Sequence, residues 1–302
     1  MNIRVPRWLH YGISLLLAVG LGYAVVGQFH DTQALGQLDR YLNDFQSDFS
    51  IWPLLLAIIM MPVNWGMEVY KWKILVPRSG FEEAAEVVLG GLSWSIWTPL
   101  GVGDYVGRAY VQKNQRAIRT AMNTFMASFT QNMGNALWAI LLVGFIDTSW
   151  KMLWGINWWV YALGFFLLLL ILFFIVPKDL LPGIPARTDR LNLLNWSVVR
   201  ALIYILQYAL VLQAFGSDVP FSVTMMLIAI VYLWQSGMPV PEVVGIILKV
   251  ELAILIFSYE GINELLAVLS ALSIWMINRL TPAIVGYIGI LKMSKDESTI
   301  HI

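Results

Sequence analysis

The chain has 302 residues, of which 59% are hydrophobic and 13% charged, and its mean hydropathy is +0.70; these values are typical of an integral membrane protein and exclude an ordinary soluble domain. Its 19 Lys and Arg residues balance its 19 Asp and Glu residues, and the absence of cysteine excludes disulfides and thiol chemistry. The three histidines, His10, His30 and His301, lie near the ends of apolar segments, so neither a histidine metal site nor a Ser-His-Asp triad is expected. We therefore expect no cofactor and no enzymatic activity.

Six apolar stretches have about the 20 residues that a helix needs to cross a bilayer. They lie at about 8–28, 51–73, 119–146, 153–176, 197–215 and 264–291. The first follows Arg4 and Arg7 but is longer than the apolar run of a signal peptide, so we expect a retained helix. Two further apolar stretches, 84–107 and 221–258, are interrupted by Pro and Gly. The pattern predicts a single all-α polytopic membrane domain over 1–302, with about six transmembrane helices and two broken or re-entrant helical pairs.

Lys and Arg predict the orientation, because the cytoplasmic flanks of membrane helices collect them. With the N-terminus inside, 15 of the 19 basic residues fall on the cytoplasmic side, Arg200 among them. Basic residues then flank 84–107 on both sides, so this stretch should enter and leave from the cytoplasm. The flanks of 221–258 contain acidic residues instead, so that stretch should enter and leave from outside, and the C-terminus should lie inside.

The two broken stretches indicate an inverted repeat. Residues 51–146 and 197–291 each contain a crossing, a re-entrant pair and a crossing, in opposite directions, an arrangement whose broken helices usually meet at a substrate site. SIWTPLGVGDYVGR, which begins at Ser95, and QSGMPVPEVVGIILK, which begins at Gln235, each contain a Ser, a Pro break, an acid and then a base. The residues that we expect at the breaks are Thr98, Pro99, Gly101 and Gly103 in the first half and Pro239 and Pro241 in the second.

Two charged pairs in the first half have helical spacing. Asp104 and Arg108 are four residues apart, so they can pair on one helix face and line a membrane cavity, or they can form an ordinary cap beside a short loop. Glu68 and Lys71 are three apart near the end of a crossing. Glu68 either faces the cavity or simply pairs with Lys71, which can also extend to the interface.

The second half carries charges at membrane depth. Glu242 and Lys249 are seven residues apart and share a helix face, whereas Glu251 points elsewhere. Arg279 lies near the middle of its crossing, where a charge costs about 2.5–3.5 kcal/mol, so it needs an acidic partner such as Glu242 or Glu251, or an anionic lipid phosphate. Gln131 and Asn135, one turn apart in the third crossing, are more typical of interhelical contacts than of a site.

Four segments carry a resemblance to a known family: NWGMEVYKWKIL, VVLGGLSWSIWTPLGVGDYVGRA, MPVPEVVGIILKVE and IWMINRLTPAIVGYIG. Over most of 50–292 the chain resembles the transmembrane region of the lysylphosphatidylglycerol synthase family, also called flippase-like. Glu68 and Lys71 match the family pattern N-W-x-x-E-x-x-K-W. The matches to the break pattern T-P-x-x-x-G-[ED]-x-x-x-R are Thr98, Pro99, Gly103, Asp104 and Arg108. The second break is matched only loosely, at Pro241, Gly245, Lys249 and Glu251, without the usual Gly-rich turn.

The resemblance implies a lipid flippase of a bacterial cytoplasmic membrane, which moves a phospholipid or amino lipid between leaflets. The resemblance points to Glu68, Lys71, Asp104, Arg108, Lys249 and Glu251 as site residues, and the charges at membrane depth add Glu242 and Arg279 to the candidates. Bases of this set would meet the phosphate and acids an amine. The chain ends at Ile302 without room for the aminoacyl transferase of some family members, so a separate lipid-modifying enzyme is one expected partner. A homo-oligomer is another, and nucleic acid is not expected. Two alternatives stay open: a non-transporting subunit of a lipid or glycan assembly system, and a small-solute transporter.

Overall fold

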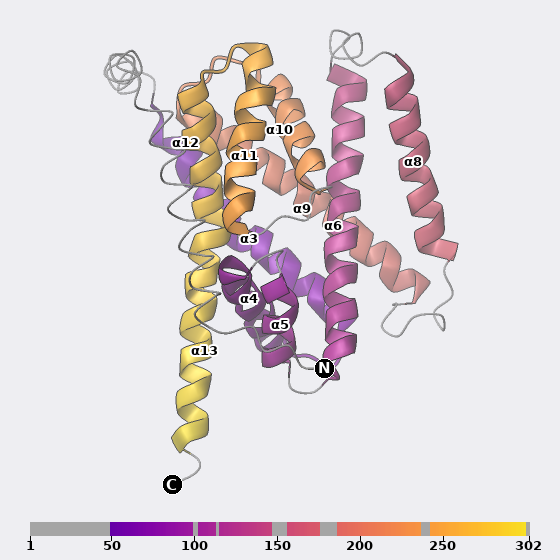
Figure 1. Ribbon diagram of the computed structural model, residues 1–302, viewed down its shortest axis with the longest axis vertical. Coiled ribbons are helices and arrows are strands. Elements are labelled where there is room, and N and C mark those ends of the chain that lie inside the picture. Colours follow the sequence, from indigo (N-terminus) through magenta and orange to yellow (C-terminus); the bar gives the residue numbers. More distant parts are fainter. Residues whose placement is uncertain are drawn as a thin grey trace, which may run out of the picture. The chain divides into compact units, whose positions relative to one another are not determined.

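A computed structural model describes residues 49–98, 102–112, 115–146, 156–175, 186–236 and 242–299. The chain divides into two units, Met1–Phe49 and Ser50–Ile302, and the elements below belong to the second. Within the described ranges every regular element is a helix, which confirms the all-α prediction (Figure 1). The first predicted crossing, 8–28, lies outside the described residues, as do four predicted break residues, Pro99, Gly101, Pro239 and Pro241.

The helices follow the predicted segments, except that the helix at 187–214 begins ten residues before the crossing predicted at 197–215. Their bounds are α3 Ile51–Leu75, α4 Phe81–Trp97, α5 Val102–Val111, α6 Ala117–Ile146, α8 Ile156–Ile175, α9 Arg187–Ala214, α10 Phe221–Ser236, α11 Glu242–Phe257, α12 Glu264–Trp275 and α13 Thr281–Thr299. A short 3₁₀-helix, η2 (Ser258–Glu260), follows α11, and a π-helix, η3 (Met276–Leu280), joins α12 to α13.

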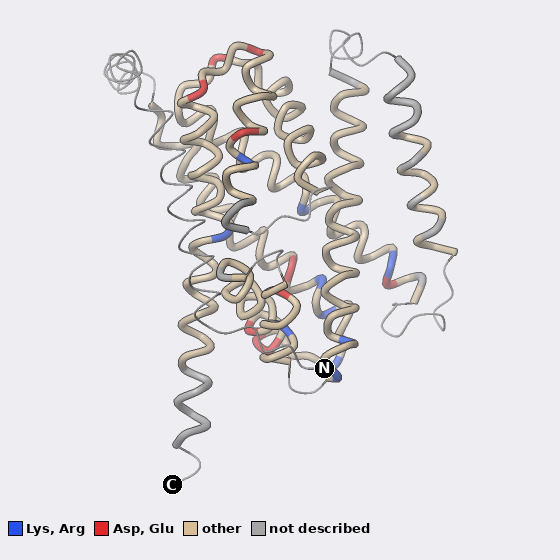
Figure 2. The backbone as a smooth tube through the Cα atoms, viewed as in Figure 1, with Lys and Arg blue, Asp and Glu red and all other residues tan. Residues whose placement is uncertain are grey.

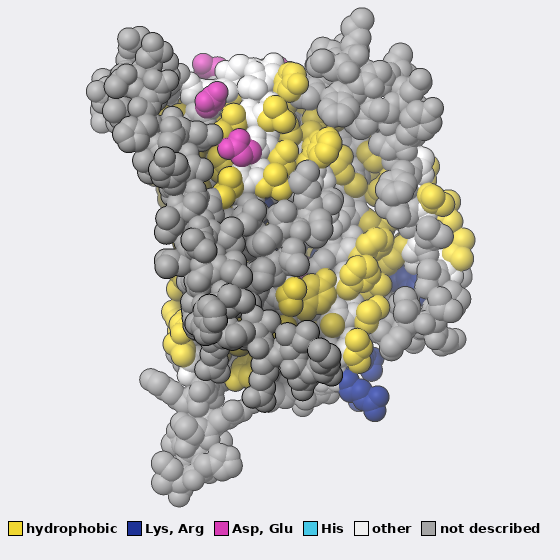
Figure 3. Space-filling view, in the orientation of Figure 1, with side chains coloured by type: hydrophobic (Ala, Val, Ile, Leu, Met, Phe, Trp, Pro, Cys, Tyr) yellow, Lys and Arg dark blue, Asp and Glu magenta, His cyan; other side chains and the backbone are white. Residues whose placement is uncertain are grey.

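Three of the described helices are long and apolar enough to cross a membrane: α3, most of α9, and the continuous run Glu264–Leu291. They correspond to the crossings predicted at 51–73, 197–215 and 264–291. α6 and α8 occupy the positions of two further predicted crossings without belonging to this group. In α6 the polar residues Gln131, Asn132 and Asn135 interrupt the apolar sequence. Figure 3 shows hydrophobic side chains over the visible face, with acidic side chains near one end and Lys and Arg near the other.

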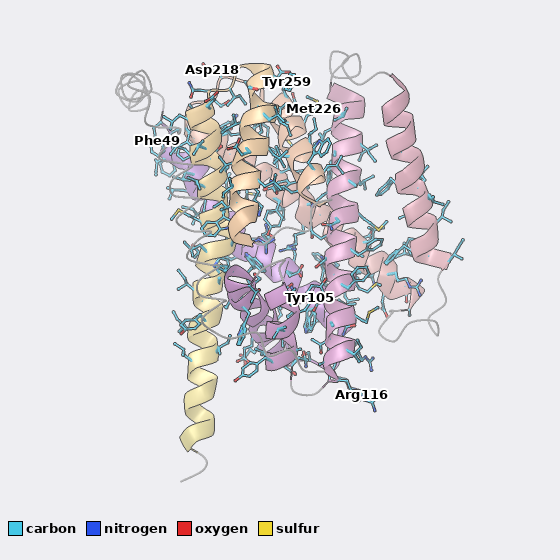
Figure 4. The ribbon with its side chains drawn as sticks, viewed as in Figure 1. Phe49, Tyr105, Arg116, Asp218, Met226 and Tyr259 are labelled. Atoms are coloured by element: carbon cyan, nitrogen blue, oxygen red, sulfur yellow. The ribbon has the colours of Figure 1, made fainter. Side chains whose placement is uncertain are left out.

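The two stretches predicted to be broken form two helical hairpins, α4 with α5 and α10 with α11. Helices of 17, 10, 16 and 16 residues rise only about 15–25 Å, less than the roughly 30 Å of a hydrocarbon core. Arg78, before α4, and Arg119, after α5, line one cavity, so the first hairpin starts and finishes at the same end of the bundle. Asp218 and Tyr259, which flank the second hairpin, lie at the end opposite to Arg116 (Figure 4).

Thr98 explains how the chain leaves α4 and begins α5. Its Oγ1 donates to the carbonyl of Trp94 at 3.0 Å and accepts the backbone N–H of Gly103 at 2.6 Å. Backbone groups at helix ends need such partners, most of all in an apolar environment. Thr98 is therefore a break residue as predicted, whereas Gly103 lies in the first turn of α5 and not in the break.

Glycine at position 103 is required by close packing between the two helices. A Cβ there would collide with the Trp94 carbonyl and the Thr98 hydroxyl. One turn later, a Cβ on Gly107 would lie 2.9 Å from the Cα of Gly91 in α4. Small residues at these positions let the two backbones approach each other.

Replacement of Gly103 by Ala should destabilise the fold by roughly 1–3 kcal/mol, because the added methyl group overlaps backbone atoms of α4. Thermal unfolding of the detergent-solubilised protein measures this effect. The control is Gly66→Ala in α3, where a Cβ meets no atom within 4 Å and the change should be neutral or slightly stabilising. Equal unfolding temperatures for both variants would show that α4 and α5 are not packed this closely.

Cysteine labelling of this cysteine-free chain tests the hairpin geometry. Single cysteines at Arg78 and Arg116 should react with an impermeant maleimide from one side of the membrane, and cysteines at Asp218 and Tyr259 from the other. Labelling of Arg78→Cys and Arg116→Cys from opposite sides would mean that the first hairpin crosses the bilayer.

Candidate functional site

A cavity of about 480 Å³ lies where the two hairpins meet. Ser95 and Asp104, on either side of the first break, line it together with Ser236 and Gly245, on either side of the link between α10 and α11. The remaining lining comes from α3, α6, α9, α12 and η3. Both segments that the sequence predicted to be broken therefore contribute to one cavity.

Charged side chains line this cavity, and bases outnumber acids. Among the lining residues are the bases Arg108, Arg200, Lys249 and Arg279 and the acids Glu68 and Asp104. Figure 2 shows positions of Lys, Arg, Asp and Glu between the two ends of the bundle as well as near them. The formal charge of the described lining is thus positive by two, which favours an anionic ligand.

Glu68 is the centre of the charged cluster. One of its carboxylate oxygens, Oε1, accepts from Nη2 of Arg108 at 3.1 Å, and the other, Oε2, accepts from Nη1 of Arg200 at 2.8 Å. Nζ of Lys71 lies 3.2 Å from the same Oε2. One buried carboxylate thus contacts three cations, from α3, α5 and α9, and compensates charges that would otherwise be costly to bury.

Lys71 does not extend to the membrane interface. Its side chain is fully buried and donates to the carbonyl of Ala127 at 3.0 Å and to Oε1 of Gln131 at 3.3 Å. The interpretation of Lys71 as an interfacial residue is therefore wrong, while its predicted pairing with Glu68 is present. Lys71 belongs to the charged cluster but does not line the cavity.

Arg108 forms the predicted pair with Asp104 and also has one guanidinium nitrogen without a described hydrogen-bond partner. Its Nε donates to Oδ1 of Asp104 at 2.8 Å, and its guanidinium stacks over Trp72 at 4.9 Å. Its Nη1 is buried and has no hydrogen-bond partner within the described structure. Trp275 also lines the cavity, and its indole Nε1 is a second buried donor without a described partner. Buried donors are nearly always satisfied in proteins, so these two atoms suit an acceptor on a ligand or a water molecule in the cavity.

Arg200 is a site residue that the sequence prediction assigned to the cytoplasmic flank. It lies 13 residues into α9, about 20 Å along the helix, and is buried. Besides Glu68 it contacts Oδ1 of Asn64 at 2.8 Å and the ring of Trp65 at 5.2 Å. The sequence feature that indicates its burial is the apolar run around Arg200, which continues to Ala214. The assignment to the flank failed because α9 begins earlier than the predicted crossing.

Gln131 and Asn135 also belong to the site. Oε1 of Gln131 accepts from Lys71 and, at 3.2 Å, from Nη1 of Arg200. Nδ2 of Asn135 donates to Oγ of Ser236 at 3.0 Å, which connects α6 to the end of α10. Both residues make the interhelical contacts that were expected of them, and both line the cavity in addition.

The four charged residues predicted in the second half do not all lie at the cavity. Lys249 and Arg279 line the cavity, and Arg279 lies in the π-helix η3, a distortion that is frequent at functional sites. Glu251 is exposed on α11 and does not line the cavity, so the structure does not bring it together with the other predicted site residues. It is two residues from Lys249, about 200° around the helix. Glu242 begins α11, and its side chain lies outside the described residues.

The described residues include no group of three or more His, Asp or Glu side chains placed to hold a metal ion. Comparison with protein families, curated proteins and solved structures finds no match to this chain. Arguments about function therefore depend on the chemistry of the cavity itself.

Removal of the Glu68 carboxylate should destabilise the protein strongly. Glu68→Gln leaves three buried cations without their shared anion, a change that typically costs about 3–5 kcal/mol. The double variant Glu68→Gln/Lys71→Met should recover part of this loss, because it removes one of the uncompensated charges. Chemical denaturation in detergent measures both variants.

Asp104→Asn is the matched control, since Asp104 is more exposed than Glu68 and contacts one cation. It should cost about 1 kcal/mol or less. Equal costs for Glu68→Gln and Asp104→Asn would contradict the central position of Glu68.

Proposed function

We propose that the protein is a flippase-like transporter that moves a phospholipid or amino lipid between the leaflets of a bacterial cytoplasmic membrane. The observation that carries this proposal is the net positive cavity in an apolar bundle, with Arg108 Nη1 and Trp275 Nε1 as buried donors that lack an acceptor. Phosphate and carboxylate oxygens are the acceptors that suit a guanidinium best. A lipid head group brings such a phosphate to membrane depth.

The size of the cavity supports a head group as its occupant. About 480 Å³ falls within the range of roughly 300–1,000 Å³ that is usual for small-molecule sites. Two long acyl chains exceed such a space, so they would remain in the bilayer while the head group moves. Exposed apolar side chains on α3 and α13, such as Ile59 and Val285, suit contact with those chains.

The packing of the helices supports an inverted repeat as the framework for this transport. We match α3, α4, α5 and α6 of the first half with α9, α10, α11 and the α12–α13 run of the second. Under this match α4 packs against α13 as α10 packs against α6, and α5 packs against α6 as α11 packs against α12. α3 packs against α9, the contact expected close to an internal two-fold axis. Two such halves can alternate access to a shared cavity.

The charge distribution supports a cytoplasmic location for the end with Arg78, Arg116 and Arg119. The opposite end, at Asp218 and Tyr259, would face outward. In this orientation the first hairpin enters from the cytoplasm and the second from outside. We place both chain termini on the cytoplasmic side.

Five of the six charged residues of the described lining have a defined part in this proposal. The lipid phosphate would accept from Arg108 Nη1 and Trp275 Nε1, near Arg200 and Arg279. Glu68 already accepts from three cations, so the amine of an amino lipid would meet Asp104, which lines the cavity and is partly exposed. This assignment separates two acids that the sequence left equivalent.

Flipping of acyl-labelled phosphatidylglycerol in proteoliposomes tests the proposal. Reconstituted protein should accelerate the exposure of the fluorophore to dithionite. Trp275→Phe, which removes the indole donor and keeps an aromatic ring, should slow the protein-dependent rate at least threefold. Arg108→Gln should slow it tenfold or more. Arg116→Gln, an exposed arginine that does not line the cavity, should leave the rate unchanged.

A flip rate in proteoliposomes equal to that in protein-free vesicles would overturn the proposal. Uptake of radiolabelled inorganic phosphate without lipid flipping would instead identify a small-solute transporter that uses the same cavity.

A further inference from the structure

A second cavity, of about 540 Å³, lies at the end of the bundle where the first hairpin begins and finishes. We call it the outer cavity. Its polar lining is Arg78, Ser79, Glu83, Gln112, Gln115 and Arg119, from the turn after α3, the first turn of α4, the end of α5 and the start of α6. It shares no lining residue with the cavity between the hairpins.

The polar groups of the outer cavity suit an anion. Arg78 and Arg119 are exposed and carry two positive charges, against one acid, Glu83, which accepts from Gln112 Nε2 at 3.0 Å. Ser79 is only 5% exposed, and its Oγ has no hydrogen-bond partner within the described structure. A buried hydroxyl that lines a basic cavity and lacks a partner indicates an absent ligand.

A short series of contacts connects the two cavities. Gln112, in the lining of the outer cavity, accepts the indole N–H of Trp72 at 3.2 Å. The ring of Trp72 lies under the guanidinium of Arg108, which lines the inner cavity. Gln112 directly follows α5, and its backbone N–H donates to the carbonyl of Arg108 at 2.8 Å, so the two residues are one helical turn apart, about 6 Å. A group bound near Gln112 is therefore one helical turn from the open donor of Arg108.

We propose that the outer cavity is a second phosphate-binding site, an entry site that binds the head group before it reaches Arg108. The role of entry site rests on the proposed lipid transport, whereas the binding of a phosphate monoester or diester does not. Arg78 and Arg119 supply positive charge to the site, and the hydroxyl of Ser79 donates a hydrogen bond to a phosphate oxygen. Trp72 and Gln112 separate this site from the inner cavity.

Cysteine protection in the cysteine-free chain tests this proposal. Gln115→Cys reports on the outer cavity and Ser128→Cys on the inner one, since each residue lines its cavity and is accessible. The protein is held in a maltoside detergent, which carries no phosphate, and the rate of reaction with N-ethylmaleimide is measured. The probes are short-chain dihexanoylphosphatidylglycerol and inorganic phosphate, at millimolar concentrations.

Dihexanoylphosphatidylglycerol should slow the labelling of Gln115→Cys at least fivefold. This protection should disappear in the Arg78→Gln/Arg119→Gln background and weaken with Ser79→Ala. It should persist with Arg116→Gln, an exposed arginine at the same end that does not line the cavity. Equal protection by inorganic phosphate would support the site with a soluble phosphate as its ligand, and protection by the lipid alone would support a head group.

Protection of Ser128→Cys without any protection of Gln115→Cys would overturn the outer site and leave the proposed function intact. Protection of Gln115→Cys without protection of Ser128→Cys would support the outer site and count against lipid binding in the inner cavity. Protection of Gln115→Cys that survives Arg78→Gln/Arg119→Gln would overturn the assignment to these residues.

Discussion

The contact of one carboxylate, Glu68, with Lys71, Arg108 and Arg200 is the interaction on which the rest of the structure depends. Three buried cations are tolerable only because they share this anion and find further oxygen acceptors around it. The same contact connects α3 and α9, the central pair of helices, to α5 in the first hairpin. Gln207 strengthens the central pair, since it accepts from Nδ2 of Asn64 at 2.9 Å.

An excess of positive charge follows from this arrangement. Glu68 is shared by three cations, so it cannot neutralise all of them, and Asp104 adds one further negative charge beside Arg108. Lys249 and Arg279 bring more positive charge from the second half. The bundle thus keeps a basic cavity between its helices, with donors on Arg108 and Trp275 that have no partner within the described structure. An anion that enters the cavity needs to displace no existing partner from those two atoms.

The parts of the fold that were predictable from sequence are local in the chain. Apolar length predicted the helices, charged flanks predicted that 84–107 returns to the end where it starts, and helical spacing predicted the Asp104 and Arg108 pair. Contacts between distant segments were not predictable, because a single sequence does not show which helices face each other. Arg200 meets Glu68 across 132 positions, a contact that the sequence does not show. It was assigned to a flank because α9 begins earlier than the predicted crossing. Glu251 was included among the site residues because it is an acid close to Lys249 in the sequence. It lies on another face of α11, which does not line the cavity.

The central claim is that the cavity between the hairpins binds the phosphate of a lipid head group. A cryo-EM structure of the protein in nanodiscs containing phosphatidylglycerol tests it most directly. We expect head-group density inside the cavity, with a phosphate oxygen about 3 Å from Nη1 of Arg108. A well-resolved cavity that contains only water, with all lipid head groups confined to the membrane surfaces, would contradict the claim.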